Sequence, residues 1–237
     1  MSTEKTDFTL LEQSLGIIFN DKALLKRAFT HRSYINEHPG TDLRHNERLE
    51  FLGDAVLELV ITDYLFAKYP DTPEGQLTAY RASLVRTESI SDAARALGFE
   101  EYLLLSKGEA KDTGKARAYI LANSFESFIG AVYLDQGYDR AKKFIGDQLF
   151  AKIDDIVHEG SWKDAKSWLQ EKAQEKLSIT PTYVVVNEVG PDHDKLFTIG
   201  VVFHDDIVAE GTGHSKQEAQ QKAAKAALMK MGWKVGE

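Results

Sequence analysis

The residues most able to do chemistry lie in one largely apolar segment, residues 45–61. Its acidic side chains recur at intervals of three, four and four residues, at Glu47, Glu50, Asp54 and Glu58. This spacing puts them in one stripe along an α-helix whose other faces are apolar, so the helix is expected to lie in a core. Carboxylates in a core need a cation or a metal ion to offset their charge. The alternative, a solvated acidic face, would normally mix lysine and arginine among the acids.

A second apolar helix is predicted over residues 118–135. Asn123 and Glu126 share one of its faces, and the small Gly130 one turn later allows another helix to approach closely. If this face meets the first stripe, four oxygen ligands come together: Glu50, Asp54, Asn123 and Glu126. A ligand set without histidine or cysteine suits a hard cation such as Mg²⁺ or Mn²⁺. Taken alone, the Asn-x-x-Glu pattern is weak, because a buried asparagine is usually just hydrogen-bonded.

Composition limits the class of protein without choosing its function. The chain has 237 residues, 43% of them hydrophobic, which suggests one or two globular domains. It has no cysteine, so disulfides and thiolate metal sites are excluded. The N-terminus lacks a basic region followed by an apolar one, and no apolar run approaches the roughly 18 residues of a membrane span. We therefore expect a cytoplasmic protein that does not bind a membrane.

The net charge of −8 argues against nucleic acid only superficially. From residue 163 onward there are 10 lysines and 11 acidic residues, so most of the negative charge lies in the first 162 residues with the proposed metal ligands. Bound cations would offset part of that charge and attract phosphates. Any nucleic-acid binding should then depend on local basic patches.

At this point the residues carry a family resemblance. Residues 46–56, Asn-Glu-Arg-Leu-Glu-Phe-Leu-Gly-Asp-Ala-Val, resemble the signature of the bacterial ribonuclease III family. Three shorter motifs follow the family's order around it, Thr-His-Arg-Ser-Tyr at 30–34, Pro-Glu-Gly-Gln-Leu at 73–77 and Arg-Ala-Ser-Leu-Val at 81–85. The resemblance runs from about residue 10 to about residue 232, because the C-terminal part is similar to the double-stranded RNA-binding domain that follows the nuclease domain in this family.

The resemblance implies an endoribonuclease that hydrolyses double-stranded RNA, such as ribosomal and messenger precursors, with Mg²⁺ or alternatively Mn²⁺ and no small-molecule cofactor. Products would carry 5′-phosphate and 3′-hydroxyl ends. Asp54 and Glu126 would be catalytic, and Glu47 and Glu74 would be secondary acids. The chain departs from the family at Asn123, where aspartate is commoner. The family also forms homodimers, and Phe51 beside the acidic stripe is either an interface residue or a core residue.

Helical periodicity continues to Ile156 and is lost over residues 157–162. Helices are expected at 10–15, 21–29, 47–68, 74–85, 88–97, 119–136 and 139–156. An amphipathic helix at 166–175 then precedes strands at 182–187, 196–203 and 207–210 and a last helix that Ser215 and Glu218 can cap. The predicted fold is mainly α: a helical domain (1–156), a linker (157–162), a small α-β-β-β-α domain (163–232) and a tail (233–237).

The C-terminal domain resembles double-stranded RNA-binding domains at their three RNA-contacting regions, residues 169–171, 190–195 and 211–216. In such domains the first helix and the turn between strands 1 and 2 enter successive minor grooves, while the last helix meets phosphates. The implied contacts are Gln170, Glu171, His193, Lys195, Lys216 and Lys222. A lysine-rich helix alone is usually just solvated. Gln217 replaces a lysine common in the family, so phosphate binding should be weaker, partly offset by Lys222.

Several alternatives stay open. His193-Asp194 resembles the dipeptide of metal-dependent phosphohydrolases, but it lies in a Gly-Pro turn without that site's other ligands. His31 is either a general base or a hydrogen-bonded structural residue, and the structural role is favoured. The chain could also be a catalytically impaired RNA-binding or ribosome-assembly factor, or a structural partner in a processing complex. Because three of the four expected ligands are acids, the sequence favours the enzyme.

Overall fold

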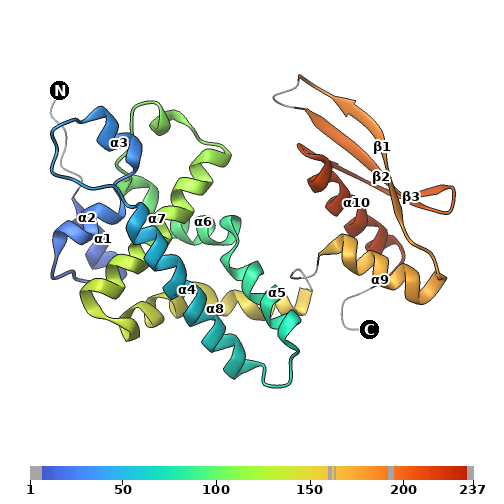
Figure 1. The fold of residues 1–237 in the computed structure, drawn as a ribbon, viewed down its shortest axis with the longest axis horizontal. Coiled ribbons are helices and arrows are strands. Elements are labelled where there is room, and N and C mark those ends of the chain that lie inside the picture. The colour runs from blue at the N-terminus through green and yellow to red at the C-terminus, as the bar shows by residue number, and fades with distance from the viewer. Residues whose placement is uncertain (1–6, 160–161, 163, 192–194, 234–237) are drawn as a thin grey trace. The chain divides into compact units, whose positions relative to one another are not determined.

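The computed structural model describes residues 7–159, 162, 164–191 and 195–233, and it divides into two compact units, Met1–Asp155 and Ile156–Glu237. The first unit is helical, and the second is a three-stranded sheet with two helices (Figure 1). The predicted fold class is therefore confirmed. Within the described part of the chain, no helix is long and apolar enough to cross a membrane.

The helices of the first unit follow the predicted order, with differences at their ends. They are α1 (Phe8–Leu15), α2 (Lys22–Ala28), α3 (Arg32–Glu37), α4 (Glu47–Lys68), α5 (Glu74–Val85), α6 (Thr87–Ala96), α7 (Lys115–Gln136) and α8 (Tyr138–Glu159), with 3₁₀ turns η1 (Phe99–Tyr102) and η2 (Glu109–Lys111). The sequence does not predict α3, because six residues are too few to show a period. The first residues of α7, Lys115 and Ala116, are exposed and carry no apolar signal, and α8 continues beyond Ile156.

Phenylalanine rings form the centre of the first unit and fix the position of α7. Phe125 and Phe128 of α7 are fully buried, as are Phe29 and Phe99. The ring centroids of Phe99 and Phe128 lie 5.2 Å apart, and those of Phe29 and Phe99 lie 4.9 Å apart. Such aromatic pairs contribute about 0.5–1.5 kcal/mol each beyond their buried area. Helix α7 thus packs at the centre, against α4, α6 and α2.

Helix α4 is not buried on all sides, which corrects the expectation of a core helix. Leu57, Val60 and Ile61 are fully buried, but the side chains of Phe51 and Phe66 are 82% and 74% exposed. The buried face packs on α7, and no described element covers the other face. The apolar residues of α4 predict that most of its sides are shielded from water. They do not show which side is covered by another element of the same chain.

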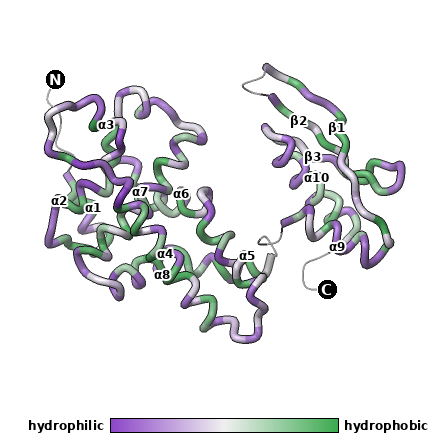
Figure 2. The backbone as a smooth tube through the Cα atoms, viewed as in Figure 1, coloured by the Kyte–Doolittle hydropathy of each residue, from purple (hydrophilic) through white to green (hydrophobic). Residues whose placement is uncertain are grey.

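The second unit is an antiparallel sheet with two helices. Its elements are α9 (Ala165–Leu177), β1 (Thr182–Val189), β2 (Leu196–Phe203), β3 (Asp206–Gly213) and α10 (Lys216–Lys230), with strand order β1-β2-β3. Leu169 of α9, Val201 of β2 and Ala223 of α10 belong to its core, and Figure 2 shows hydrophobic residues along β2 and the middle of β1. The predicted cap of α10 is present, because the Ser215 hydroxyl accepts from the Glu218 amide at 3.1 Å.

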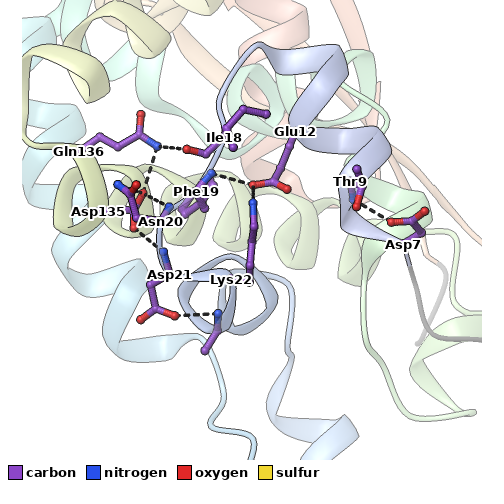
Figure 3. A network of polar contacts seen from close by, with 11 residues as sticks. Asp7, Thr9, Glu12, Ile18, Phe19, Asn20, Asp21, Lys22, Asp135 and Gln136 are labelled. Atoms are coloured by element: carbon purple, nitrogen blue, oxygen red, sulfur yellow. Dashed lines mark hydrogen bonds and ion pairs between the residues drawn. The ribbon is translucent and has the colours of Figure 1, made fainter.

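Two carboxylates fix the chain between α1 and α2, and one of them ties it to α7 (Figure 3). Glu12 is buried, accepts from the Phe19 amide at 2.7 Å and pairs with Lys22 at 2.6 Å. Asp135, near the end of α7, accepts from the backbone amides of Asn20 and Asp21 at 2.9 and 2.8 Å. Burial alone would raise the pKa of Asp135, but these hydrogen bonds outweigh it and hold that pKa below its usual value.

We predict that Asp135→Ala lowers the free energy of unfolding by about 1–2 kcal/mol at neutral pH, because two backbone amides lose a charged acceptor near the surface. A group with a lowered pKa stabilises the fold above its unfolded pKa of about 4, and the contribution is lost as the pH falls through its folded pKa. Urea unfolding at several pH values should therefore show the difference shrinking in acid. Asp42→Ala, which removes an exposed carboxylate, is the control; an equal effect of both substitutions would contradict this role of Asp135.

Candidate functional site

The candidate site forms where α4 and α7 cross with their backbones in direct contact. A Cβ atom added to Gly53 would lie 1.7 Å from the Glu126 carbonyl oxygen, and one added to Gly130 would lie 2.3 Å from the Leu49 carbonyl oxygen. Real side chains do not approach that closely, so both positions require glycine. The sequence predicts close approach at Gly130, and the structure adds Gly53 as its counterpart on α4.

The crossing brings three carboxylates of the predicted site into one electrostatic cluster. Burial, together with the charges of Asp54 and Glu50, raises the pKa of Glu126 to about 8. Burial also raises the pKa of Glu50, with Glu47 and Asp54 adding to the effect. Loss of hydration and the charge of Glu58 raise the pKa of Asp54. The acids of α4 therefore act on Glu126 across the helix crossing.

Nothing in the described part of the chain neutralises this cluster. No hydrogen bond or ion pair from any described residue reaches the carboxylates of Glu50, Asp54 or Glu126. Asn123 lies one turn before Glu126 on α7 and is partly buried. Oxygen donors with uncompensated negative charge fit a divalent cation. Among the described residues, however, no three acidic or histidine side chains converge closely enough to hold an ion, so the fit rests on donor chemistry and charge.

The two secondary acids lie in different surroundings. Glu47, at the start of α4, is 3.8 Å from the Arg32 guanidinium and 3.7 Å from the His45 ring. Glu74, at the start of α5, accepts a hydrogen bond from Thr78 at 3.0 Å. It lines a groove of about 420 Å³ together with Phe66 near the C-terminal end of α4. Within one chain, Glu47 is thus electrostatically linked to Glu50, whereas Glu74 belongs to a separate groove.

Asn46 anchors the start of α4, a role that the sequence analysis did not assign to it. Its buried side chain donates to the Ala28 carbonyl at 3.2 Å, and its backbone amide donates to Thr30 at 2.9 Å. Its own carbonyl accepts from Ser127 of α7 at 3.4 Å. Asn46 therefore fixes the acidic end of α4 against both α2 and α7. The sequence signal for such a role was an asparagine directly before the acidic first turn of a helix, a position typical of an N-cap. Here, however, the Asn46 side chain forms no helix cap.

His31 has a structural role in the described contacts. Its Nδ1 atom accepts from the Ser33 amide at 3.3 Å and caps α3, and it lies 2.8 Å from the Ser33 hydroxyl. That hydroxyl in turn accepts from the Ser106 amide at 3.0 Å. Burial lowers the pKa of His31. These contacts agree with the favoured structural role and tie α3 to the loop after η1.

Another residue not identified from the sequence holds this loop to α7. The buried Arg117 guanidinium donates to the carbonyls of Asp112, Glu109 and Ala110 at 2.9 to 3.0 Å. An arginine in the first turns of a helix gives no signal that it will be buried, because arginine is usually exposed. Arg117 therefore fixes the loop relative to the helix that carries Asn123 and Glu126.

The predicted RNA contacts of the second unit lie on the elements expected for them. Gln170 and Glu171 are exposed on α9, while Lys216 and Lys222 are exposed on α10. Lys195 and Lys216 lie 3.9 and 3.3 Å from the carboxylate of Glu188, a residue that the sequence analysis did not single out. Lys222 pairs with Glu218 at 2.8 Å. His193 lies outside the described residues.

An all-helical unit with an acidic cluster at a helix crossing, followed by an α-β-β-β-α unit, agrees with the order of domains that the resemblance implies, a nuclease domain and then a double-stranded RNA-binding domain. The chain belongs to the ribonuclease III family. A ribonuclease-III-like family model matches residues 21–153, and a double-stranded RNA binding motif matches residues 165–231.

Individual relatives support the assignment. Ribonuclease 3 of Enterococcus faecalis is 47% identical over 222 residues, which are 93% of this chain and 95% of that protein. Ribonuclease 3 of Streptococcus thermophilus is 45% identical over 94% of this chain and 96% of its own length. A solved structure of the ribonuclease III nuclease domain of Campylobacter jejuni matches with a TM-score of 0.54 and 40% identity, covering 60% of this chain and 98% of that chain; that structure is described as showing structural flexibility in a region involved in dimer formation.

We predict that Gly53→Ala lowers the free energy of unfolding by about 2 kcal/mol or more, because the new methyl group forces α4 and α7 apart. Gly75→Ala is the matched control, since a Cβ atom there meets nothing within 4 Å. That substitution should be neutral or stabilise helix α5 by up to about 1 kcal/mol. Urea unfolding of both variants measures the difference. A Gly53 variant as stable as the Gly75 variant would show that the helices do not depend on this contact.

Proposed function

We propose that this chain is an endoribonuclease that hydrolyses the phosphodiester bonds of double-stranded RNA and leaves 5′-phosphate and 3′-hydroxyl ends. The observation that carries the proposal is the uncompensated acidic cluster at the α4–α7 crossing, in a chain that also has a double-stranded RNA-binding domain. Ribosomal and messenger RNA precursors are the proposed substrates. A binding factor without activity is not favoured, because the acids of the cluster are retained.

We propose Mg²⁺, with Mn²⁺ as an alternative, as the metal, held by Glu50, Asp54, Asn123 and Glu126. Such an ion supplies Lewis acidity and lowers the pKa of a bound water. Burial and the charges of Asp54 and Glu50 hold the pKa of Glu126 at about 8, and a bound cation would favour its ionised form. Asp54 and Glu126 are assigned the central roles, because the charge of Asp54 acts on Glu126 across the crossing.

The two units divide the work of catalysis and binding. The proposed boundaries remain residues 1–156 for the catalytic domain and 163–232 for the RNA-binding domain. Lys195, Lys216 and Lys222, with Gln170 and Glu171 on α9, would contact phosphates and the minor grooves. Recognition would follow the shape of the duplex more than its sequence. His193 keeps its proposed contact role on the basis of the resemblance alone.

We also propose that the protein acts as a homodimer through the uncovered face of α4. Phe51, Leu59 and Phe66 are 82%, 57% and 74% exposed, and their spacing places them along one side of the helix. Large exposed apolar side chains on one side of a helix mark a candidate interaction surface, and a second copy related by a twofold axis presents the same surface in return. Phe51 adjoins Glu50 in sequence, so dimerisation would place the two active sites near the interface.

We predict that Glu126→Gln reduces cleavage of a long RNA duplex by about a hundredfold or more, because the amide keeps the shape of the side chain but removes the ligand charge. Duplex affinity measured in EDTA should stay within about twofold, since the residue holds metal and not RNA. Glu101→Gln, at an exposed acid outside the site, controls for net charge. Parallel loss of binding and cleavage would remove the assignment of Glu126 as a ligand.

We predict that Asn123→Asp lowers the Mg²⁺ concentration for half-maximal cleavage by about three- to tenfold, because a charged ligand replaces a neutral one. Duplex affinity without metal should hardly change. A titration of cleavage rate against Mg²⁺ measures the effect. An unchanged titration would mean that residue 123 is not a ligand, and a wild type that is inert until aspartate is restored would make the natural chain a binding protein.

We predict that Phe51→Ala raises the dissociation constant of the dimer by roughly thirtyfold, the effect of losing one central aromatic residue from an interface. Sedimentation velocity over a range of protein concentrations measures the constant. Leu10→Ala is the control, because Leu10 is 61% exposed on α1 and away from α4. If the wild type sediments as a monomer at all concentrations, or if both variants behave alike, the α4 face is not the interface.

A further inference from the structure

One row of residues crosses the sheet of the RNA-binding domain where α10 begins. Glu188 of β1 pairs with Phe197 of β2, and Phe197 pairs with Gly213 of β3. Residues paired in this way point to the same face of a sheet. A Cβ atom at Gly213 would lie 2.8 Å from the Ala219 amide nitrogen, so this is the face that α10 covers. The row therefore brings Glu188 beneath the first turn of α10.

Glu188 lies between two lysines that come from two different predicted RNA-contacting regions. The Lys216 ammonium is 3.3 Å from Oε1 of Glu188 and sits 5.4 Å above the centre of the Phe197 ring. The Lys195 ammonium is 3.9 Å from Oε2 of the same carboxylate. The side chains of Glu188 and Lys195 are only 36% and 31% exposed, so solvent screens this arrangement less than a fully exposed pair.

We infer that Glu188 is an internal counter-ion of the RNA-binding surface, a carboxylate that occupies the lysines until an RNA phosphate displaces it. The inference rests on the proposed function and names a residue that limits the affinity of the protein for double-stranded RNA. Both Lys195 and Lys216 pair with this carboxylate, so a ligand that offers phosphates to both regions of the domain replaces both of its ion pairs. Glu188 thus opposes the binding of any polyanion that reaches only one of the two lysines.

This counter-ion also changes how binding responds to salt. The salt dependence of RNA binding counts the ions released when lysines neutralise phosphates. A lysine already paired with a carboxylate adds little net positive charge to the surface, so its contact with phosphate yields less of that effect. Residues 163–237 are nearly neutral overall, with 10 lysines and 11 acids, and this also weakens the salt dependence of binding. Removing the carboxylate should restore both affinity and salt dependence.

The test measures binding of the full-length protein to a perfect RNA duplex in EDTA, over a series of salt concentrations. Glu188→Gln should tighten binding by about two- to fivefold at low salt, the range of a partly exposed ion pair. It should also steepen the slope of log affinity against log salt by up to about one unit. Glu210→Gln is the matched control, because it changes net charge equally but lies on β3 opposite Gly200, in a different row of the sheet. Thermal unfolding checks that both variants keep the fold.

A second comparison tests whether the gain in duplex affinity depends on Lys216. In a Lys216→Ala background, Glu188→Gln should produce a smaller gain than in the natural chain, since one of the two cations is gone. If Glu188→Gln leaves affinity and slope unchanged, weakens binding, or acts no differently from Glu210→Gln, the inference is overturned while the proposed function stands. A natural chain that binds no duplex would remove the proposed function and this inference together.

Discussion

The contact between the backbones of α4 and α7 is the constraint on which the candidate site depends. Gly53 and Gly130 have no side chains to hold the helices apart, so the carbonyls of Glu126 and Leu49 lie against the opposite helix. Glu50 and Asp54 flank Gly53 in the sequence, and their charges consequently reach Glu126. The repulsion among these acids opposes folding, and the phenylalanine core around α7 and the anchoring of α4 by Asn46 offset it.

The acidic cluster and the RNA-binding surface differ in how their charges are balanced. The cluster concentrates negative charge that a bare phosphate would avoid, and a divalent cation makes it attractive. The RNA-binding surface has lysines, but three of them, Lys195, Lys216 and Lys222, already pair with Glu188 or Glu218. Neither unit therefore relies on a general positive field. Association with RNA should follow the geometry of the duplex, and cleavage should follow the supply of metal.

Much of this architecture can be predicted from the sequence, because its signals are local and periodic. The stripe of acids on α4, the helical run of α7 and the Ser215 cap of α10 all depend on spacing within one element. The exposure of Phe51 could not be predicted in the same way, since it depends on which face of α4 the rest of the chain covers. The pairing of Glu188 with Lys216 depends on strand register and on a bulge between Val185 and Asn187, which periodicity does not specify. The tertiary position of Glu74 could not be predicted from the sequence either. It matches an acid of the family, but in one chain it lines a separate groove with Phe66.

The most direct test of this account is the cleavage of a long, end-labelled RNA duplex by the natural chain, first in EDTA and then with Mg²⁺ or Mn²⁺ restored. The expected result is bound but intact duplex in EDTA, and after metal addition shorter duplexes whose new ends carry 5′-phosphates. Cleavage that continues in EDTA would contradict a metal-dependent site at the α4–α7 crossing. A duplex that is bound yet uncut at every concentration of either metal would contradict the enzymatic function itself.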